Sequence, residues 1–145
     1  MNSIQLVALS LVLLFVPAMS LRKQGVAVKG QLLCNGLPAK NLKVKIYDLD
    51  RNPGDSDDLL DEKFTDARGY FQLDGTTREL TTIEPEFRAF HDCEDGNKAR
   101  PLRPFKFRPV PTEYIHHGTA EKVYDFGSIE LAPPVEGEGR TCTDE

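Results

Sequence analysis

The sequence lacks the short catalytic motifs that mark common hydrolases and nucleotide-binding enzymes. No G-x-S-x-G, H-E-x-x-H or P-loop pattern occurs in its 145 residues. Basic residues are also in the minority, because 18 Lys and Arg stand against 23 Asp and Glu and leave a formal net charge of −5. A net negative charge disfavours binding to the phosphates of nucleic acid. We therefore expect no enzyme activity, no cofactor and no nucleic-acid partner.

Long hydrophobic runs are absent after the first twenty residues. Residues 4–16 are almost entirely apolar, but this run is too short to span a bilayer. Ala18 and Ser20 place small residues at the positions that a signal peptidase reads. This pattern predicts a signal peptide at residues 1–20 and secretion of the rest of the chain to the extracellular region.

The rest of the chain alternates apolar and polar residues with a period of two. Val26, Val28 and Leu32, for example, share one face of an extended segment. The segments expected to form strands are 26–34, 42–47, 59–65, 70–73, 87–93, 105–108 and 123–131. Short strands separated by turn residues predict an all-β protein, a β-sandwich over residues 21–131. The Pro- and Gly-rich residues 132–145 are expected to be a disordered tail.

Three stretches make the pattern more specific. GQLLCNGLPAKNLKVKIYDLD, DDLLDEKFTDARGYFQLDGTTREL and HDCEDGNK follow one another between Gly30 and Lys98. In this order they resemble the transthyretin-like family of secreted nematode proteins, over about residues 25–131. The resemblance implies a prealbumin-like (transthyretin/Ig-like) sandwich of seven to eight strands and an extracellular location.

The resemblance implies no settled activity, and it leaves several hypotheses open. By analogy with transthyretin, the chain carries a small apolar ligand or engages an extracellular partner protein as a non-enzymatic binding or signalling module. A second hypothesis is a bridge to anionic phospholipid, because one family member binds exposed phosphatidylserine on dying cells. A third is a structural or host-directed secreted protein without a small ligand.

An enzymatic alternative comes from the 5-hydroxyisourate hydrolases, which resemble transthyretin closely. Those enzymes carry a histidine on the first strand and end in Tyr-Arg-Gly-Ser. This chain instead has Gln31-Leu32-Leu33-Cys34 on its first strand and ends in Thr-Cys-Thr-Asp-Glu. Both marks of the hydrolases are absent, so this alternative has no support in the sequence.

A basic stretch supplies a candidate surface for the phospholipid hypothesis. Lys98, Arg100, Arg103, Lys106 and Arg108 occur without an acidic residue among them. If Phe105 and Phe107 point inward, Lys106 and Arg108 point outward. Each basic residue close to an anionic membrane contributes about 1 kcal/mol. Arg100, Arg103, Lys106 and Arg108 are therefore predicted to bind an anionic lipid or a partner, and an ordinary solvated strand face is the alternative.

The three cysteines, Cys34, Cys93 and Cys142, leave one thiol over after a single disulfide. Many family members have Lys-Pro-Cys after the H-D-C strand, where this chain has no cysteine. If segment 87–93 runs antiparallel to segment 42–47, Cys93 lies at the same end of the sandwich as Cys34. We therefore favour a Cys34–Cys93 disulfide. It would close a loop of about 60 residues and contribute roughly 4 kcal/mol to the stability of the fold. The alternative is Cys34–Cys142 with Cys93 buried and reduced.

The most acidic stretch is DLDRNPGDSDDLLDE at residues 48–62. Its first acidic positions imitate an EF-hand, but Pro53 stands where glycine is needed and Leu59 where glutamate is needed. No helix is expected on either side. We expect a solvated loop between strands and no metal site, with a looser calcium site at the end of the sandwich as the alternative.

The histidines form no predicted metal site either. His91 lies two residues before Cys93 and is expected to be a hydrogen-bonded core residue. His116 and His117 are expected in a loop, and adjacent side chains on an extended chain point in opposite directions.

Overall fold

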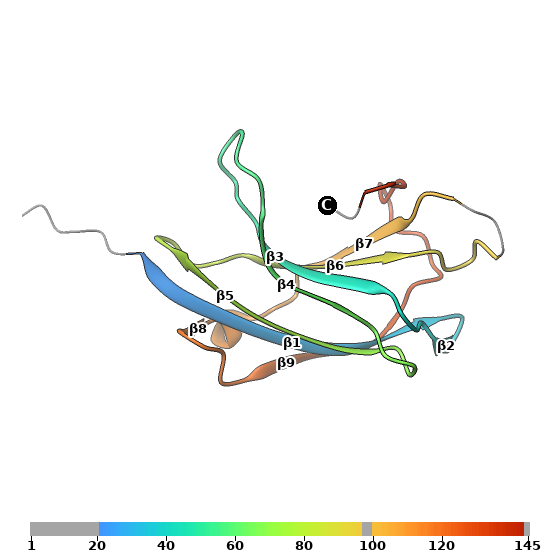
Figure 1. Cartoon of the computed structure of the whole chain (residues 1–145), viewed down its shortest axis with the longest axis horizontal. Coiled ribbons are helices and arrows are strands. Elements are labelled where there is room, and N and C mark those ends of the chain that lie inside the picture. The colour runs from blue at the N-terminus through green and yellow to red at the C-terminus, as the bar shows by residue number, and fades with distance from the viewer. Residues whose placement is uncertain (1–20, 97–99, 144–145) are drawn as a thin grey trace, which may run out of the picture.

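The computed structural model describes residues 21–96 and 100–143, so the predicted signal peptide at residues 1–20 lies outside the described residues. These residues form two layers of β-strands packed face to face (Figure 1). A short 3-10 helix, η1 (Thr112–Tyr114), is the connection that precedes β8. The described part of the chain contains no helix that is both long and apolar enough to cross a membrane.

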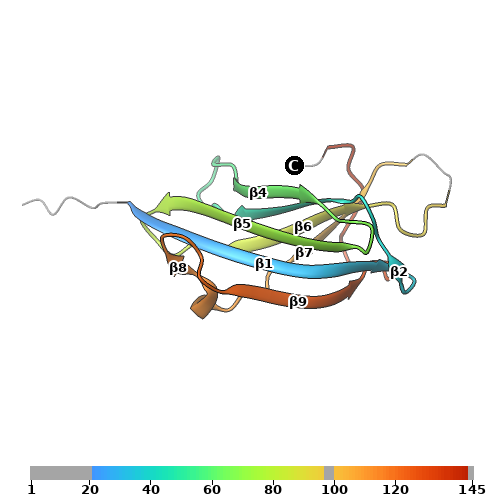
Figure 2. The same ribbon diagram turned by 60° about the horizontal axis from the view of Figure 1, so that its bottom comes forward.

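The first layer, sheet A, is organised around its longest strand, β1 (Arg22–Cys34). On one side β1 pairs antiparallel with β5 (Tyr70–Glu79), and on the other it pairs parallel with β9 (Val123–Glu130) (Figure 2). Two short strands, β2 (Leu37–Pro38) and β8 (His116–His117), also pair with β1. The two histidines therefore lie in a short strand rather than in the predicted loop.

The second layer, sheet B, has four antiparallel strands in the order β4-β3-β6-β7. Their bounds are Asp58–Phe64 for β4, Lys43–Asp48 for β3, Pro85–His91 for β6 and Arg103–Phe107 for β7. All seven predicted strands are present, although β5 continues to Glu79, well past its predicted end. The predicted β-sandwich is confirmed.

The core lies between the two sheets and is built from alternate residues of each strand. Val26, Val28 and Leu32 of sheet A are fully buried, and so is Phe87 of sheet B. Phe71 of β5 stacks on Phe87 across the core, with ring centroids 4.7 Å apart. Burying such side chains contributes about 1.5–3 kcal/mol each, which is why the period of two decides the fold.

A disulfide joins the two sheets at one end of the sandwich. Cys34 at the end of β1 is bonded to Cys93, just after β6, with Cα atoms 5.7 Å apart. The favoured pairing is therefore confirmed, and the alternative with Cys142 is wrong. Cys142 is a free, exposed thiol.

A β-bulge in β9 changes which of its residues face the core. Lys29 pairs with Asp125 and Gln31 pairs with Ser128, so two residues of β9, Phe126 and Gly127, lie opposite the single residue between them on β1. Before the bulge, Tyr124 and Phe126 pack on the core, and after it Ile129 and Leu131 do. The extra residue thus reverses the alternation of inward and outward side chains along β9.

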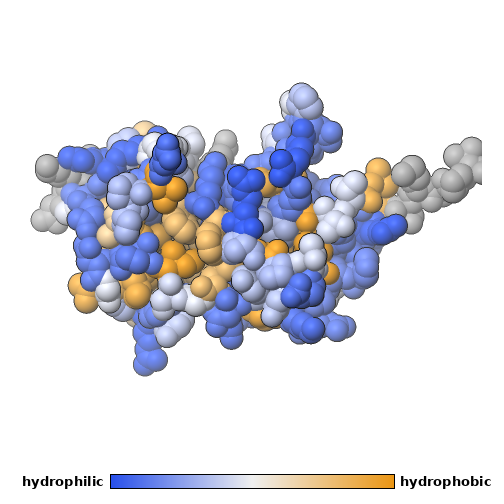
Figure 3. Space-filling model, turned by 180° about the vertical axis from the view of Figure 1, so that it is seen from behind, coloured by the Kyte–Doolittle hydropathy of each residue, from blue (hydrophilic) through white to orange (hydrophobic). Residues whose placement is uncertain are grey.

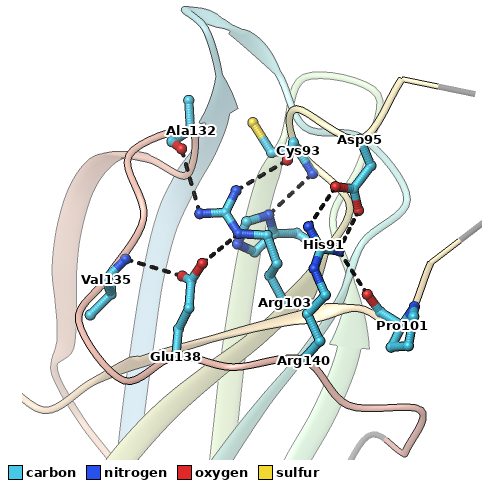
Figure 4. A network of polar contacts seen from close by, with 9 residues as sticks. All are labelled: His91, Cys93, Asp95, Pro101, Arg103, Ala132, Val135, Glu138 and Arg140. Carbon is cyan, nitrogen blue, oxygen red and sulfur yellow. Dashed lines mark hydrogen bonds and ion pairs between the residues drawn. The ribbon is translucent and has the colours of Figure 1, made fainter. Parts of the chain in front are cut away.

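Residues 132–143, which we call the C-terminal clasp, fold back onto the end of sheet B (Figure 4). Arg140 donates two hydrogen bonds of 2.7 Å to the carboxylate of Asp95. Leu102 and Thr141 exchange two backbone hydrogen bonds of 2.9 Å. The structure therefore differs from the predicted disordered tail, because residues 132–143 contact the end of sheet B. A composition poor in core-forming residues does not prevent a segment from being held by ion pairs and backbone bonds.

Candidate functional site

Arg103, one of the predicted binding residues, lies inside the protein. It is 5% exposed, and its Nε lies 2.6 Å from a carboxylate oxygen of Glu138 in the C-terminal clasp (Figure 4). Its other nitrogens donate to the carbonyl oxygens of Cys93 and Ala132, at 3.1 and 3.5 Å. Arg103 therefore fastens the clasp to β7 and is not available to a lipid surface.

His91 lies beside Arg103 and is almost completely buried. Its Nδ1 accepts a hydrogen bond of 3.2 Å from the backbone N–H of Cys93, as expected for a core histidine. Burial, followed by the nearby positive charge of Arg103, lowers the pKa of His91 to about 4. The imidazole is therefore neutral near pH 7.

The other predicted basic residues lie at the surface in different settings. Arg108 is 57% exposed, and its Nε lies 2.9 Å from a carboxylate oxygen of buried Glu86. Arg100 and Lys106 are exposed, and Lys98 lies outside the described residues. The basic residues of this stretch therefore have three kinds of surroundings. Arg103 is buried against the C-terminal clasp, Arg108 forms a surface ion pair, and Arg100 and Lys106 are exposed.

The acidic stretch forms a connection between β3 and β4 that is held by its own side chains. Asp57 accepts a hydrogen bond from the backbone N–H of Asp50, at 3.0 Å, and Asp50 accepts one from Asn52, at 2.8 Å. The second carboxylate oxygen of Asp57 pairs with Arg88 of β6, at 2.5 Å. Residues 51–56 are exposed. This arrangement agrees with a loop between strands.

Three carboxyl groups meet at the base of this loop. Asp48, Asp58 and Glu79 each place one oxygen within 4.8 Å of the others. Burial raises the pKa of Asp48, and desolvation followed by a hydrogen bond that protonated Glu79 donates to Asp58 raises the pKa of Glu79. Carboxylates suit a hard cation, but an acidic cluster alone does not assign one. The absence of a metal site stays a prediction.

The side of the sandwich between β7 and β9 carries a continuous row of aromatic rings, which we call the aromatic seam. It consists of Phe105, Phe107, Phe126, Tyr124 and Tyr114. Successive ring centroids are 4.9 to 5.9 Å apart, and each ring is only partly buried. Figure 3 shows this side of the molecule, where hydrophobic side chains gather in the middle of a hydrophilic surround.

Sequence reasoning found two of the five residues of the aromatic seam. The alternation of β7 correctly placed Phe105 and Phe107 against the core. Tyr124 and Phe126 were missed because the bulge in β9 reverses the alternation there. Tyr114 follows two prolines in an irregular segment, where periodicity gives no information. A glycine inside a strand pattern, here Gly127, was the available sign of a bulge.

A hollow lies elsewhere, on the outer face of sheet A. Its volume is about 560 Å³, and its lining includes Lys29, Gln31, Tyr70 and Ser128. The lining combines charged and polar side chains with apolar surface from Tyr70 and Phe71.

The family model described as TTR-52, transthyretin-like family, matches residues 29–109. Transthyretin-like protein 2 of Caenorhabditis elegans is 44% identical over 126 residues, which cover 83% of this chain and 84% of that protein. Transthyretin-like protein 46 of the same organism is 44% identical over 113 residues and 77% of this chain. The chain spans 62% of the length of this second relative.

Similar solved structures are more distant. A 9R-lipoxygenase from Cyanothece matches with a TM-score of 0.43 and 21% identity, over 74% of this chain and 16% of that enzyme. An (S)-allantoin synthase matches with a TM-score of 0.34 and 19% identity, over 71% of this chain and 41% of the synthase. Likenesses this weak say nothing about activity.

Proposed function

The chain belongs to the transthyretin-like family, and from this premise we propose that it is a secreted, non-enzymatic binding protein that engages an extracellular partner protein. The Cys34–Cys93 disulfide supports secretion, because such bonds persist in oxidising compartments. The predicted signal peptide at residues 1–20 agrees with it.

The observation that carries this proposal is the aromatic seam. Five aromatic rings lie in contact along a side of the sandwich where two edge strands, β7 and β9, meet water. The centres of protein interfaces are enriched in aromatic residues and surrounded by a polar rim. The seam has this composition, and a partner protein would remove its rings from water.

Two other hypotheses have weaker support. An apolar ligand would need an apolar pocket, and the hollow on the outer face of sheet A has three charged side chains in its lining, Lys29, Asp66 and Asp125. Binding to anionic phospholipid would rest on Arg100 and Lys106, because Arg103 is buried and Arg108 is paired with Glu86. Two exposed charges contribute about 2 kcal/mol at a membrane, which does not hold a protein there alone.

The test compares two lysine variants against an arrayed set of extracellular protein domains. Tyr124→Lys places a charge in the aromatic seam, while its aliphatic stem can still cover the neighbouring rings. Leu37→Lys adds the same charge on β2, where Leu37 is 70% exposed and outside the seam. We expect a partner domain that binds the wild type and Leu37→Lys with similar affinity and binds Tyr124→Lys at least about tenfold more weakly.

Circular dichroism and the intact disulfide confirm that both variants are folded before they are compared. Partner domains that all bind Tyr124→Lys as tightly as the wild type would remove the seam from the proposal. Selective binding to phosphatidylserine liposomes, with no protein partner found, would replace it with the phospholipid hypothesis.

A further inference from the structure

The hollow on the outer face of sheet A is formed by two rows of side chains that run across three strands. In one row Gln72 of β5, Lys29 of β1 and Asp125 of β9 are neighbours in register. In the other row the neighbours are Tyr70, Gln31 and Ser128. All six residues line the hollow of about 560 Å³, together with Asp66 from the turn before β5.

Two glycines, Gly30 and Gly127, lie between the rows. Gly127 is the outward-facing residue of the β9 bulge, and its φ of 70° is one that few other residues adopt. Gly30 faces the core, where a Cβ atom would come within 3.0 Å of the ring of its neighbour Phe71. The floor between the rows is formed by Gly30, Phe71 and Gly127, at the position of the β9 bulge.

Several polar groups of the hollow are already held in position. The hydroxyl of Ser128 lies 3.2 Å from Oε1 of Gln31, and Nε2 of Gln31 donates a 2.9 Å hydrogen bond to the carbonyl of Arg68. Asp125 accepts a 2.8 Å hydrogen bond from the N–H of Gly127. Groups held in this way lose little conformational freedom when a ligand binds.

The chemistry of the lining selects the kind of ligand. An apolar molecule would take amide, hydroxyl and carboxylate groups out of water without replacing their hydrogen bonds. A strongly charged molecule of either sign would meet a like charge, because the lining contains Lys29 as well as two aspartates, Asp66 and Asp125. Amides and hydroxyls both donate and accept hydrogen bonds, which matches a ligand rich in hydroxyl groups.

The aromatic residue at one end of the hollow completes the match. Tyr70 is 50% exposed, so its ring is available to pack against the apolar face of a ligand. A sugar presents both features at once, since its C–H groups form a flat apolar face and its hydroxyls form a polar edge. We infer that the hollow binds a short stretch of a neutral glycan. This site lies on the face of sheet A and is separate from the aromatic seam, so either proposal can fail without the other.

The experiment applies the mature chain to a glycan array that carries neutral, sialylated and sulfated oligosaccharides. We expect binding to one or more neutral glycans, followed by titration of the strongest one in solution. Tyr70→Ala removes the stacking ring and should weaken this binding at least about tenfold. Ser128→Trp fills the hollow from an exposed position and should abolish it.

Matched variants separate the hollow from general surface effects. Tyr70→Phe keeps the ring and should bind within about threefold of the wild type. Phe64→Ala removes a ring on β4 of sheet B that is 55% exposed, and it should bind like the wild type. The inference would be overturned if the protein bound no neutral glycan or bound charged glycans alone. It would also be overturned if Tyr70→Ala and Ser128→Trp bound the glycan as tightly as the wild type.

Discussion

The two sheets of the sandwich use the polar residues of their outer faces in different ways. On sheet B, Lys45, Glu86 and Arg88 are each at most 6% exposed although they point away from the core. On sheet A, Lys29 and Gln72 are exposed. The difference arises because residues of sheet B cover one another, whereas those of sheet A surround a hollow.

Arg88 shows how the outer face of sheet B is filled. Its guanidinium lies over the ring of Tyr47, 4.1 Å from the ring centroid. It also donates to Glu86 of its own strand and to Asp57 of the acidic loop. A guanidinium with its hydrogen bonds satisfied in this way is part of the protein's own structure. The many charges on the outer face of sheet B therefore stabilise the fold, while the neutral polar groups of sheet A remain accessible to a ligand.

The largest effect is expected from Arg88→Ala. The change leaves Glu86, 2% exposed, with only the ion pair to Arg108, and unpaired buried charge is costly. We expect the free energy of unfolding to fall by about 3–4 kcal/mol. Lys29→Ala on sheet A should change it by less than about 0.5 kcal/mol. Urea denaturation of both variants measures the contrast, and equal losses would show that the two faces do not differ.

A smaller effect is expected from the pH dependence of His91. Its pKa is about 4 in the folded protein and about 6.5 when unfolded. The unfolded state therefore binds more protons between these values, so stability is complete above pH 6.5 and is lost as the pH falls toward 4. The loss amounts to about 3 kcal/mol at most.

Urea midpoints at pH 7 and pH 4.5 test this expectation. His91→Gln should remove most of the His91 contribution, whereas His117→Gln changes an exposed histidine and should leave the pH dependence as it is. An unchanged pH dependence in His91→Gln would mean that other groups, such as the carboxylates, account for acid sensitivity.

The smallest effect, and one of opposite sign, is expected from Glu79→Gln. Glu79 of sheet A meets Asp48 and Asp58 of sheet B, so that like charges face one another where the sheets join. Because the pKa of Glu79 is raised in the folded protein, the protein loses stability as the pH rises through this pKa. Neutralising it should therefore stabilise the protein at pH 7, by less than about 1 kcal/mol.

Thermal unfolding at pH 7 and pH 4 checks the sign. The gain should be present at pH 7 and shrink at pH 4, where Glu79 is more often protonated. A loss of stability at pH 7 would instead indicate that the cluster is held together by a bound cation, and adding calcium would then raise the melting temperature of the wild type.

The strands and the disulfide were accessible from the sequence for a simple reason. Alternation places Val26 and Val28 in the core whatever the neighbouring strands are, because a strand has only two faces. The position of Cys34 and Cys93 at strand ends then allowed their pairing to be predicted from strand direction. The candidate binding surfaces were less accessible, because each combines residues from three or more separate segments.

Arg103 and the C-terminal clasp show where sequence reasoning failed. Alternation places Arg103 on the same face of β7 as Phe105 and Phe107, but it cannot show that the partner of Arg103 is Glu138, 35 residues further along the chain. The composition of the clasp likewise predicted that it cannot form a core. Composition gives no information about the contacts of the clasp with Asp95 and Leu102. Such contacts depend on distances between segments that local patterns do not contain.

The sequence by itself determined a β-sandwich, because period-two alternation is a local property of the chain, and its motifs carried the resemblance to the transthyretin-like family. Only the tertiary structure decided which charges are buried, which aromatic rings form the seam and where the hollow lies. Those features depend on register between strands. The extra residue of the β9 bulge, at Phe126 and Gly127, turns the aromatic side chains of β9 inward. It also separates the outward-facing side chains that surround the hollow.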